Sequence, residues 1–232
     1  MPPVINKPNE YLSPEDIELI TSKASCLRDE LLIRVLFFGA CRESEALSLG
    51  VDDVDFATGT VKIEHLKATL NLRCPCGHRV GRGHTYCPGC GVKIEGTLAE
   101  KRERRRVRSI PLDGKTLQLL ASYIEQGGPV VKDGKRLIFG IRQTQAYNIV
   151  RGCAEKAGFR ALLNPETGRL RHVSPHRLRD AFATMIVQRD DSTDSIRMLQ
   201  EQLGHANIGT TMRYRKVAGK ELREWYGKTV EP

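Results

Sequence analysis

Apolar and polar positions along the first fifty residues predict a helical start to the chain. The run from Ser13 to Asp16 supplies a capping residue, a first-turn proline and two acids, which predicts a helix to about residue 24. Residues 27–39 are apolar on almost every side, so this helix should lie at the centre of the core. A further short helix is expected over residues 43–49.

The pattern then changes from helical spacing to alternation. Residues 51–66 alternate around Ala57-Thr58-Gly59, which predicts a β-hairpin. A third strand is expected at residues 105–112, and a cysteine-rich insert of roughly residues 72–97 separates it from the second strand. These features predict an α+β fold that is mostly helical, with one small three-stranded antiparallel sheet.

Helical spacing returns in the second half of the chain. Apolar side chains in residues 175–189 recur at i, i+3, i+4, i+7 and i+8, and should face the core. His176 and Arg179 lie off this stripe and about 60° apart around the helix axis, so both can face one ligand. A helix over residues 193–203 should end at the glycine that follows, which places His205 at a sharp corner.

Composition adds a binding partner to this picture. The 232 residues include 37 Lys+Arg against 28 Asp+Glu, a formal net charge of +9, which favours a polyanion such as nucleic acid. No apolar run approaches the roughly 20 residues that span a bilayer, and the N-terminus lacks a signal-peptide pattern. We therefore expect a cytoplasmic protein with no membrane partner.

Four of the seven cysteines fall within 17 residues, and in a cytoplasmic protein such clustering favours a metal over disulfides. The second pair has zinc-knuckle spacing, whereas the first pair is one residue closer, which leaves His78 or His84 as substitute ligands. An insert with so few apolar residues needs a metal to fold. We predict structural Zn²⁺ with no open coordination position. The expected ligands are Cys74, Cys76, Cys87 and Cys90.

Five residues spread over the chain can together handle a phosphodiester. Arg42 and Arg179 offer planar forks that match phosphate oxygens and neutralise charge on a pentavalent phosphate. Tyr214 can attack phosphorus once its proton is removed, and His176 or His205 can accept a proton near neutral pH. This set is sufficient for transesterification without a catalytic metal.

At this point the sequence resembles a known family. The segments Gly39–Leu49, Ser174–Thr184 and Leu203–Val217 are similar to the three motif boxes of the tyrosine recombinase (phage integrase) family. The resemblance covers nearly the whole chain apart from the cysteine insert. It implies the tyrosine-recombinase catalytic fold over residues 1–71 and 98–232, with a zinc ribbon at residues 72–97 inserted in the hairpin between the second and third strands.

The resemblance also implies a role for each site residue. Arg42 and Arg179 would clamp the scissile phosphate, and His176 would transfer a proton, with His205 as a supporting hydrogen-bond donor. Tyr214 would form a 3′-phosphotyrosine and free a 5′-hydroxyl. Because religation conserves the bond energy, the family needs no ATP.

The family carries a general-acid lysine on the hairpin between its second and third strands. Lys67 matches that place best and Lys101 is the alternative. The sequence departs from the family at Asp180, where histidine is common. Only 41 residues precede Arg42, where the family usually has a separate DNA-clamping domain, so the chain is either a catalytic-only enzyme or part of a longer one.

A basic run over residues 101–108 should form a strand whose alternate arginines lie along DNA phosphates, giving salt-sensitive binding. Two more arginines flank Tyr214. The predicted DNA contacts are Arg104, Arg106, Arg108, Arg213 and Arg215.

These observations predict a site-specific DNA recombinase or integrase acting on double-stranded DNA. We expect a monomer alone and a homotetramer on DNA, with the segment Lys220–Tyr226 a candidate for exchange between subunits. The alternatives are relaxation of DNA by a type IB topoisomerase mechanism, and a zinc-ribbon DNA-binding regulator on a degenerate recombinase fold. The target site, and the choice between integration, excision and dimer resolution, stay open at this point.

Overall fold

A computed structural model describes residues 11–80, 84–93, 98–163 and 169–215. The chain divides into two compact units, one formed by Met1–Ile63 with Arg108–Pro232 and the other by Glu64–Val107. The smaller unit therefore contains the predicted cysteine insert together with the strand segments on either side of it. The segment Lys220–Tyr226 lies outside the described residues.

The larger unit begins with the two helices that the sequence predicts. Helix α1 spans Pro14–Thr21 and begins at a capping box in which Ser13 and Asp16 exchange side-chain to backbone hydrogen bonds of 2.8 and 3.2 Å. Helix α2 spans Leu27–Phe38 and is almost wholly buried. It contacts α1, α4 (Gly114–Glu125), α5 (Gln143–Lys156) and α6 (Pro175–Arg189), so the apolar helix lies at the centre as expected.

One charged residue lies inside this central helix. Arg34 is 1% exposed and donates to Glu18 at 2.6 Å, Asp113 at 2.9 Å and Thr116 Oγ1 at 2.9 Å. Asp113 also accepts from the Thr116 backbone N–H and so caps α4. The charge of Arg34 is therefore compensated, as a buried cation requires, and it joins three helices.

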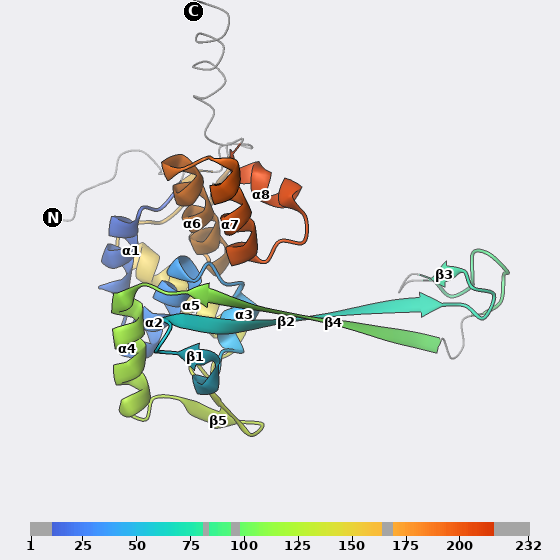
Figure 1. Ribbon diagram of the computed structural model, residues 1–232, viewed down its shortest axis with the longest axis horizontal. Coiled ribbons are helices and arrows are strands. Elements are labelled where there is room, and N and C mark those ends of the chain that lie inside the picture. The colour runs from blue at the N-terminus through green and yellow to red at the C-terminus, as the bar shows by residue number, and fades with distance from the viewer. Residues whose placement is uncertain (1–10, 81–83, 94–97, 164–168, 216–232) are drawn as a thin grey trace, which may run out of the picture. The chain divides into compact units, whose positions relative to one another are not determined.

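The remaining helices build the part of the unit that carries the predicted motifs. In Figure 1, α6, α7 and α8 lie together, and each contacts the other two. A second apolar cluster of Ala40, Ala183, Val187, Leu199 and Leu203 packs between them. The predicted bounds of α6 and α7 are confirmed. The helices are α3 (Glu43–Leu47), α4 (Gly114–Glu125), α5 (Gln143–Lys156), α6 (Pro175–Arg189), α7 (Thr193–Leu203) and α8 (Ile208–Arg215).

The predicted sheet is present. Strand β1 (Val54–Asp55) pairs antiparallel with β2 (Thr60–Arg73), and β4 (Leu98–Pro111) pairs with β2 in the opposite direction (Figure 1). A short strand, β3 (Arg79–Val80), adds to the far end of β2. The three predicted strands are confirmed, and β2 and β4 are longer than the alternation indicated.

Two small hairpins were not predicted from the sequence. Strands β5 (Val130–Lys132) and β6 (Lys135–Leu137) pair across Asp133-Gly134, both of which have positive φ. This is the backbone that a two-residue type I′ turn requires, and Asp-Gly is a preferred sequence for it. Strands β7 (Leu162–Leu163) and β8 (Leu170–Arg171) form the second pair.

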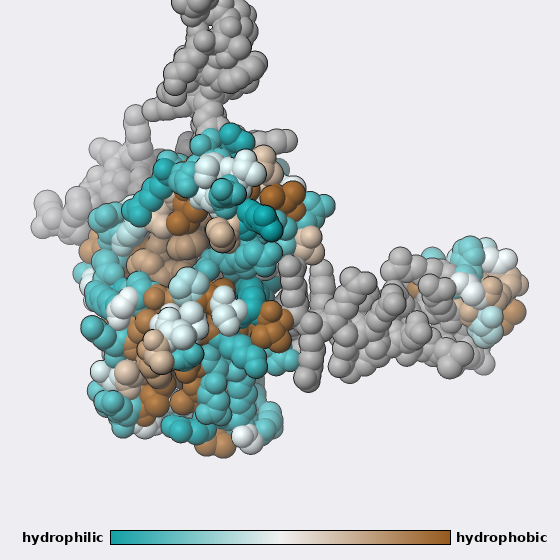
Figure 2. All heavy atoms as spheres, viewed as in Figure 1, coloured by the Kyte–Doolittle hydropathy of each residue, from teal (hydrophilic) through white to brown (hydrophobic). Residues whose placement is uncertain are grey.

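The viewed surface of the larger unit mixes hydrophilic and hydrophobic residues, with no single face given over to either kind (Figure 2). Among the described residues, no helix combines the length and hydropathy that crossing a bilayer demands.

Candidate active site

A pocket of about 310 Å³ in the larger unit collects four of the predicted site residues. Arg42 lies between α2 and α3, and His176 and Arg179 occupy the first turns of α6. His205 follows the end of α7. Tyr214, on α8, does not line this pocket. The lining residues are Cys41, Arg42, Glu43, Ser44, Gln143, His176, Arg179 and His205.

A buried carboxylate orients two arginines at the base of this site. Glu45 is 3% exposed and accepts from Arg42 Nη1 at 2.7 Å and from the Arg42 backbone N–H at 2.9 Å. Arg108 forms a bidentate pair with the same carboxylate, at 3.1 and 2.7 Å. Burial opposes ionisation of Glu45, but the hydrogen bonds from Arg108 and Arg42 outweigh it and lower its pKa to about 2.

The end of helix α7 fixes all three arginines of the site. Gln202 O accepts from Arg108 Nε at 3.1 Å, Leu203 O from Arg179 Nη2 at 2.6 Å, and Gly204 O from Arg42 Nη2 at 3.5 Å. The last carbonyls of a helix lack partners within the helix and carry its negative dipole end, so they favour cations.

The turn after α7 leaves no room for a larger residue. Gly204 adopts the left-handed conformation with φ of 63°. A Cβ at this position would lie 2.7 Å from Arg108 Nη1. The glycine therefore permits both the sharp corner before His205 and the close approach of Arg108.

Arg179 is the most deeply placed of the three cations, at 2% exposed. Besides Leu203 O it donates to Ala40 O at 2.7 Å and to His205 Nε2 at 3.1 Å. Burial and the charge of Arg42 lower its pKa to about 10, which leaves the guanidinium charged at neutral pH. Three cations around one buried carboxylate give the site a net positive charge suited to a phosphate.

The contacts of His205 define its tautomer. Arginine can only donate, so Nε2 of His205 accepts from Arg179, and the ring proton lies on Nδ1, 3.0 Å from Thr211 Oγ1. Burial, with the positive charges of Arg179, Arg42 and Arg108, lowers the pKa of His205 to about 4. The resemblance implied a supporting hydrogen-bond donor at His205, and in this structure its Nε2 accepts from Arg179.

Tyr214 is held by Asp180 and by His205, of which His205 lines the pocket. Its hydroxyl donates to Asp180 Oδ1 at 2.9 Å, and its ring stacks on that of His205, with centroids 6.4 Å apart and planes within 8°. Burial first, and then the negative charge of Asp180, raise the pKa of Tyr214 well above its ordinary value. The second oxygen of Asp180 lies 3.8 Å from His176 Nε2, and the His176 side chain is 77% exposed.

The remaining predicted site residues fall into two groups, those whose side chains are outside the described part of the structure and those whose surroundings are described. Lys67 and its alternative Lys101 lie on β2 and β4, and their side chains fall outside the described part of the structure, as do those of Arg104 and Arg106. Arg108 has its guanidinium on Glu45, so this arginine is part of the pocket's support and not of an exposed row. Arg213 is exposed, and Arg215 pairs with Asp191 at 3.0 Å.

Sequence reasoning missed several residues of the site. Glu45, Asp180 and Thr211 each contact a predicted site residue, yet none was assigned a role. Glu45 had a usable signal, because an acid three residues after Arg42, at the start of a short helix, can reach back to it. The contacts of Asp180 and Arg108 join distant parts of the chain and have no local signal.

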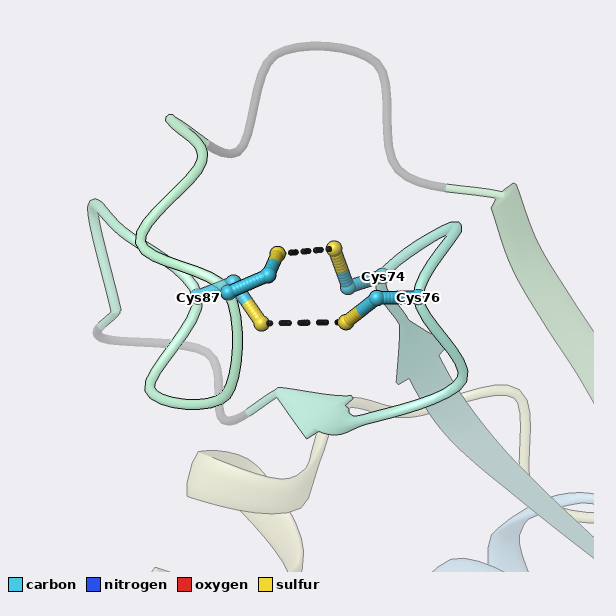
Figure 3. Close-up of side chains that lie close together, drawn as sticks. Cys74, Cys76 and Cys87 are labelled. Atoms are coloured by element: carbon cyan, nitrogen blue, oxygen red, sulfur yellow. Dashed lines mark hydrogen bonds between the residues drawn. The ribbon is translucent and has the colours of Figure 1, made fainter.

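The smaller unit holds the predicted metal ligands together. The Sγ atoms of Cys74, Cys76, Cys87 and Cys90 all lie within 4.8 Å of one another. Two pairs, Cys74–Cys90 and Cys76–Cys87, are 3.5 and 3.6 Å apart, close to the roughly 3.8 Å expected between sulfurs of a tetrahedral site with 2.3 Å zinc–sulfur bonds. Figure 3 shows Cys74, Cys76 and Cys87 with their sulfurs turned inward.

The backbone of the smaller unit supports this donor set. The Gly89 N–H lies 3.4 Å from Cys87 Sγ. Burial opposes ionisation of Cys87, but the backbone N–H groups of Cys90 and Gly89 outweigh it, and the pKa of this thiol is lowered to about 6. Neither His78 nor His84 belongs to the group of potential ligands found among the described residues. Four cysteines therefore fit a structural Zn²⁺.

Comparison with known proteins places the chain in a family. The sequence signature of the Phage integrase family matches residues 92–221, which is more than half of the chain. The chain therefore belongs to the phage integrase family, as its motif boxes predicted.

The chain is also similar to individual proteins. A tyrosine recombinase named XerA from Pyrococcus horikoshii is 28% identical over 221 residues, covering 92% of this chain and 59% of that protein. The crystal structure of XerA recombinase matches with a TM-score of 0.61 at 21% identity, covering 100% of this chain and 68% of that one.

A second solved structure is of XerH site-specific recombinase bound to a palindromic difH substrate in a post-cleavage complex. It matches with a TM-score of 0.58 at 24% identity, covering 96% of this chain and 54% of that one. Both structural likenesses confirm the predicted tyrosine-recombinase fold. The chain spans little more than half the length of the curated relatives it matches.

Proposed function

We propose that this protein is a site-specific DNA recombinase that cleaves and rejoins DNA strands through a covalent bond between Tyr214 and a 3′ phosphate. The observation that carries the proposal is the pocket in which Arg42, His176, Arg179 and His205 converge, supported beneath by Glu45 and Arg108. Membership of the phage integrase family supports the same chemistry.

In this mechanism the positive pocket binds one phosphodiester of double-stranded DNA. Arg42 and Arg179 hold the non-bridging oxygens, and their positions are fixed beforehand by Glu45 and by the carbonyls at the end of α7. Such preorganised donors stabilise the charge that develops on phosphorus without reorganising during the reaction. Arg108 contributes through Glu45 as a positioning residue.

The covalent step exchanges one phosphate ester for another. The Tyr214 oxygen forms a bond to phosphorus as the bond from phosphorus to the 5′ oxygen breaks. The phenolic proton leaves to a base, a role that we assign to His176, whose Nε2 lies 3.8 Å from Asp180 Oδ2. The departing 5′ oxygen takes up a proton from a general acid, a role that we assign to Lys67. Attack by a 5′-hydroxyl reverses these steps. The reaction therefore consumes no ATP and needs no catalytic metal.

We assign a structural Zn²⁺ to the smaller unit, Glu64–Val107, which is called the cysteine module from here on. Its four sulfurs would fill the coordination shell, so the ion would stabilise the fold of the module and take no part in the transesterification. We further propose that Arg104, Arg106, Arg213 and Arg215 contact DNA phosphates, and that the protein is monomeric alone and assembles as a tetramer on DNA. We also propose that the protein acts in the cytoplasm.

Two other functions are less well supported. A type IB topoisomerase would use the same chemistry with little sequence preference, but the curated relatives are named tyrosine recombinases. A regulator on an inactive recombinase fold would have no need of the three arginines that the structure positions around one pocket.

A randomised pool of nicked duplexes tests the proposal, because the short cleaved end diffuses away and traps the covalent intermediate. After zinc content has been measured, the protein is incubated with the pool in EDTA, denatured in SDS, and the DNA bound to it is sequenced. We expect adducts that are absent with Tyr214→Phe, and an enriched sequence. Adducts without enrichment would favour a topoisomerase, and intact binding without adducts would contradict strand transfer by this chain.

Oligomeric state is tested separately by light scattering with and without the enriched duplex. A monomer that becomes a tetramer only on DNA is the expected result, and a stable tetramer without DNA would contradict this part of the proposal.

A further inference from the structure

One carboxylate near the pocket has no part in the chemistry described above. Asp180 lies on α6, one residue after Arg179, with a side chain that is 15% exposed. Its Oδ1 accepts from the Tyr214 hydroxyl at 2.9 Å, while Oδ2 lies 3.4 Å from Arg177 Nη1 and 3.8 Å from His176 Nε2. It therefore touches both the nucleophile and the proton-transfer residue.

The hydrogen bond between Tyr214 and Asp180 also bears on the position of the Tyr214 hydroxyl. Tyr214 is absent from the lining of the pocket in which Arg42 and Arg179 converge. Its ring is held on one side by the stacked His205 ring, and its hydroxyl is directed at Asp180. The hydroxyl that would attack phosphorus is therefore hydrogen-bonded to Asp180, and the Tyr214 side chain is not among those that line the pocket.

We propose that Asp180 is a positioning residue that keeps the Tyr214 hydroxyl protonated and outside the pocket, so that the hydroxyl must leave this carboxylate before it can attack phosphorus. The inference rests on the proposed function, because it concerns the nucleophile of that reaction. Its consequence is that cleavage by Tyr214 is slower than the pocket alone would allow.

Two physical effects act in the same direction. A hydrogen bond to an ionised acceptor is roughly twice as strong as a neutral one, so leaving Asp180 costs more than leaving an amide would. A carboxylate also disfavours a second negative charge beside it, and after burial it is the charge of Asp180 that raises the pKa of Tyr214.

Other charges face the two residues as well. Arg179 from α6 and Arg213 from α8 lower the pKa of Tyr214, and His205 stacks on its ring in the neutral form. Arg177 and His176 face Asp180 from its own helix. Arg179 and Arg213 both favour the phenolate of Tyr214. Removing the Asp180 carboxylate therefore leaves surroundings that favour ionisation of Tyr214.

Asp180→Asn tests the inference because it keeps the shape and the acceptor oxygen but removes the charge. Single-turnover formation of the covalent adduct is measured on a nicked duplex across pH. We expect about a tenfold faster rate at neutral pH, and a rise in rate that begins about one pH unit lower than in the unmodified protein. Glu201→Gln is the matched control, since it removes one carboxylate from an exposed position on α7.

A second readout needs no DNA and so separates this inference from the proposed function. Tyrosine labelled with ¹³C at Cζ gives a resonance for Tyr214 that is identified by its loss in Tyr214→Phe. We expect this resonance to shift in Asp180→Asn and in Asp180→Ser, and to stay in place in Glu201→Gln. Asp180→Ser also provides a second variant if the first folds poorly.

The outcomes are distinct. A slower rate in both Asp180 variants, with the fold intact, would overturn the inference and make Asp180 the acceptor of the phenolic proton. An unchanged resonance and an unchanged rate would also overturn it. A shifted resonance with no adduct from any protein, the unmodified one included, would support the hold on Tyr214 while contradicting the proposed strand transfer.

Discussion

Two clusters of like groups in this protein are assembled in different ways. In the larger unit, three guanidinium groups surround Glu45 and donate to the carbonyls at the end of α7, so the chain itself supplies the compensating negative charge. In the smaller unit, the four sulfurs of Cys74, Cys76, Cys87 and Cys90 lie within 4.8 Å of one another and form a set that could hold a metal ion. Four thiolates at this distance would repel one another, and the proposed Zn²⁺ would balance their charge.

The two clusters therefore differ in what stabilises them. The arginine site depends on a packed core and on a carboxylate at its base, so it should survive metal removal and fail when Glu45 is changed. Among the described residues, the buried apolar cluster of the cysteine module is small and consists of Cys74, Val80 and Cys87, so its fold should depend on a cation. Four experiments test this comparison, from the largest expected effect to the smallest.

Metal removal should have the largest effect, and only on the module. Zinc sites of this kind contribute on the order of 10–16 kcal/mol of apparent binding free energy at neutral pH. A strong chelator should therefore make residues 64–107 sensitive to protease while the larger unit keeps its unfolding transition. Limited proteolysis with mass spectrometry measures this.

Cys87→Ser should reproduce the effect without a chelator, and Cys153→Ser is its control because this buried thiol lies in the larger unit. Loss of the larger unit's transition on chelation would show that the two regions do not differ as described.

Removing the carboxylate of Glu45 should damage the larger unit next most. Glu45→Ala leaves Arg42 and Arg108 without their shared partner, and breaking a buried ion pair costs about 3–5 kcal/mol. The free energy of unfolding from urea titration should fall by this amount, and adduct formation should fall at least about a hundredfold because both arginines lose their orientation.

Glu155→Gln provides the contrast for this variant. Glu155 forms an exposed pair with Arg151 at 2.7 Å, and its loss should leave both measurements unchanged. A Glu45→Ala protein as stable as the parent would contradict the view that this carboxylate holds the site together.

Lowering the pH should also remove the stabilisation that Glu45 provides, with a smaller loss of unfolding free energy than in Glu45→Ala. The pKa of Glu45 is about 2 in the folded protein, against an ordinary value of 4.5. Its stabilisation is therefore complete above about pH 4.5 and is lost as the pH falls through 2, a change of about 3 kcal/mol. Urea titrations between pH 6 and 2 should show a steeper loss of stability in the parent than in Glu45→Gln. Parallel curves would contradict the assignment.

The smallest expected effect concerns the protonation state of His205, which can be measured while the fold stays intact. The pKa of about 4 means that the ring is neutral at pH 6, with its proton on Nδ1. Nitrogen NMR of labelled histidine should show one protonated and one bare ring nitrogen for His205 at this pH. Its signal is identified by loss in His205→Gln, and a doubly protonated ring at pH 6 would contradict the tautomer.

The elements that sequence predicts well here are those whose signals are local. The bounds of α6 and α7 follow from apolar spacing, Pro175 and Gly204, and the orientation of His176 and Arg179 follows from their separation on one helix. The cysteine cluster is also local, because its four ligands fall in one short segment. The β5–β6 hairpin had a local signal in Asp133-Gly134 that was not used.

The relations between distant residues are what sequence alone did not provide. The alternation around Arg108 is compatible with an exposed row of arginines, and only its contact with Glu45, 63 residues away, places it in the site. The contact between Asp180 and Tyr214 spans 34 residues in the same way. Each of these pairings depends on how helices and strands pack, which periodicity does not report.

The end of α7 has a consequence for how this site can vary. Three consecutive carbonyls, the last at the left-handed Gly204, each accept from one of the three arginines. A core change that displaces α7 would therefore disturb the contacts of all three cations at once. A change at Gly204 would have the same reach, because it acts on the corner where these carbonyls end and on the close approach of Arg108.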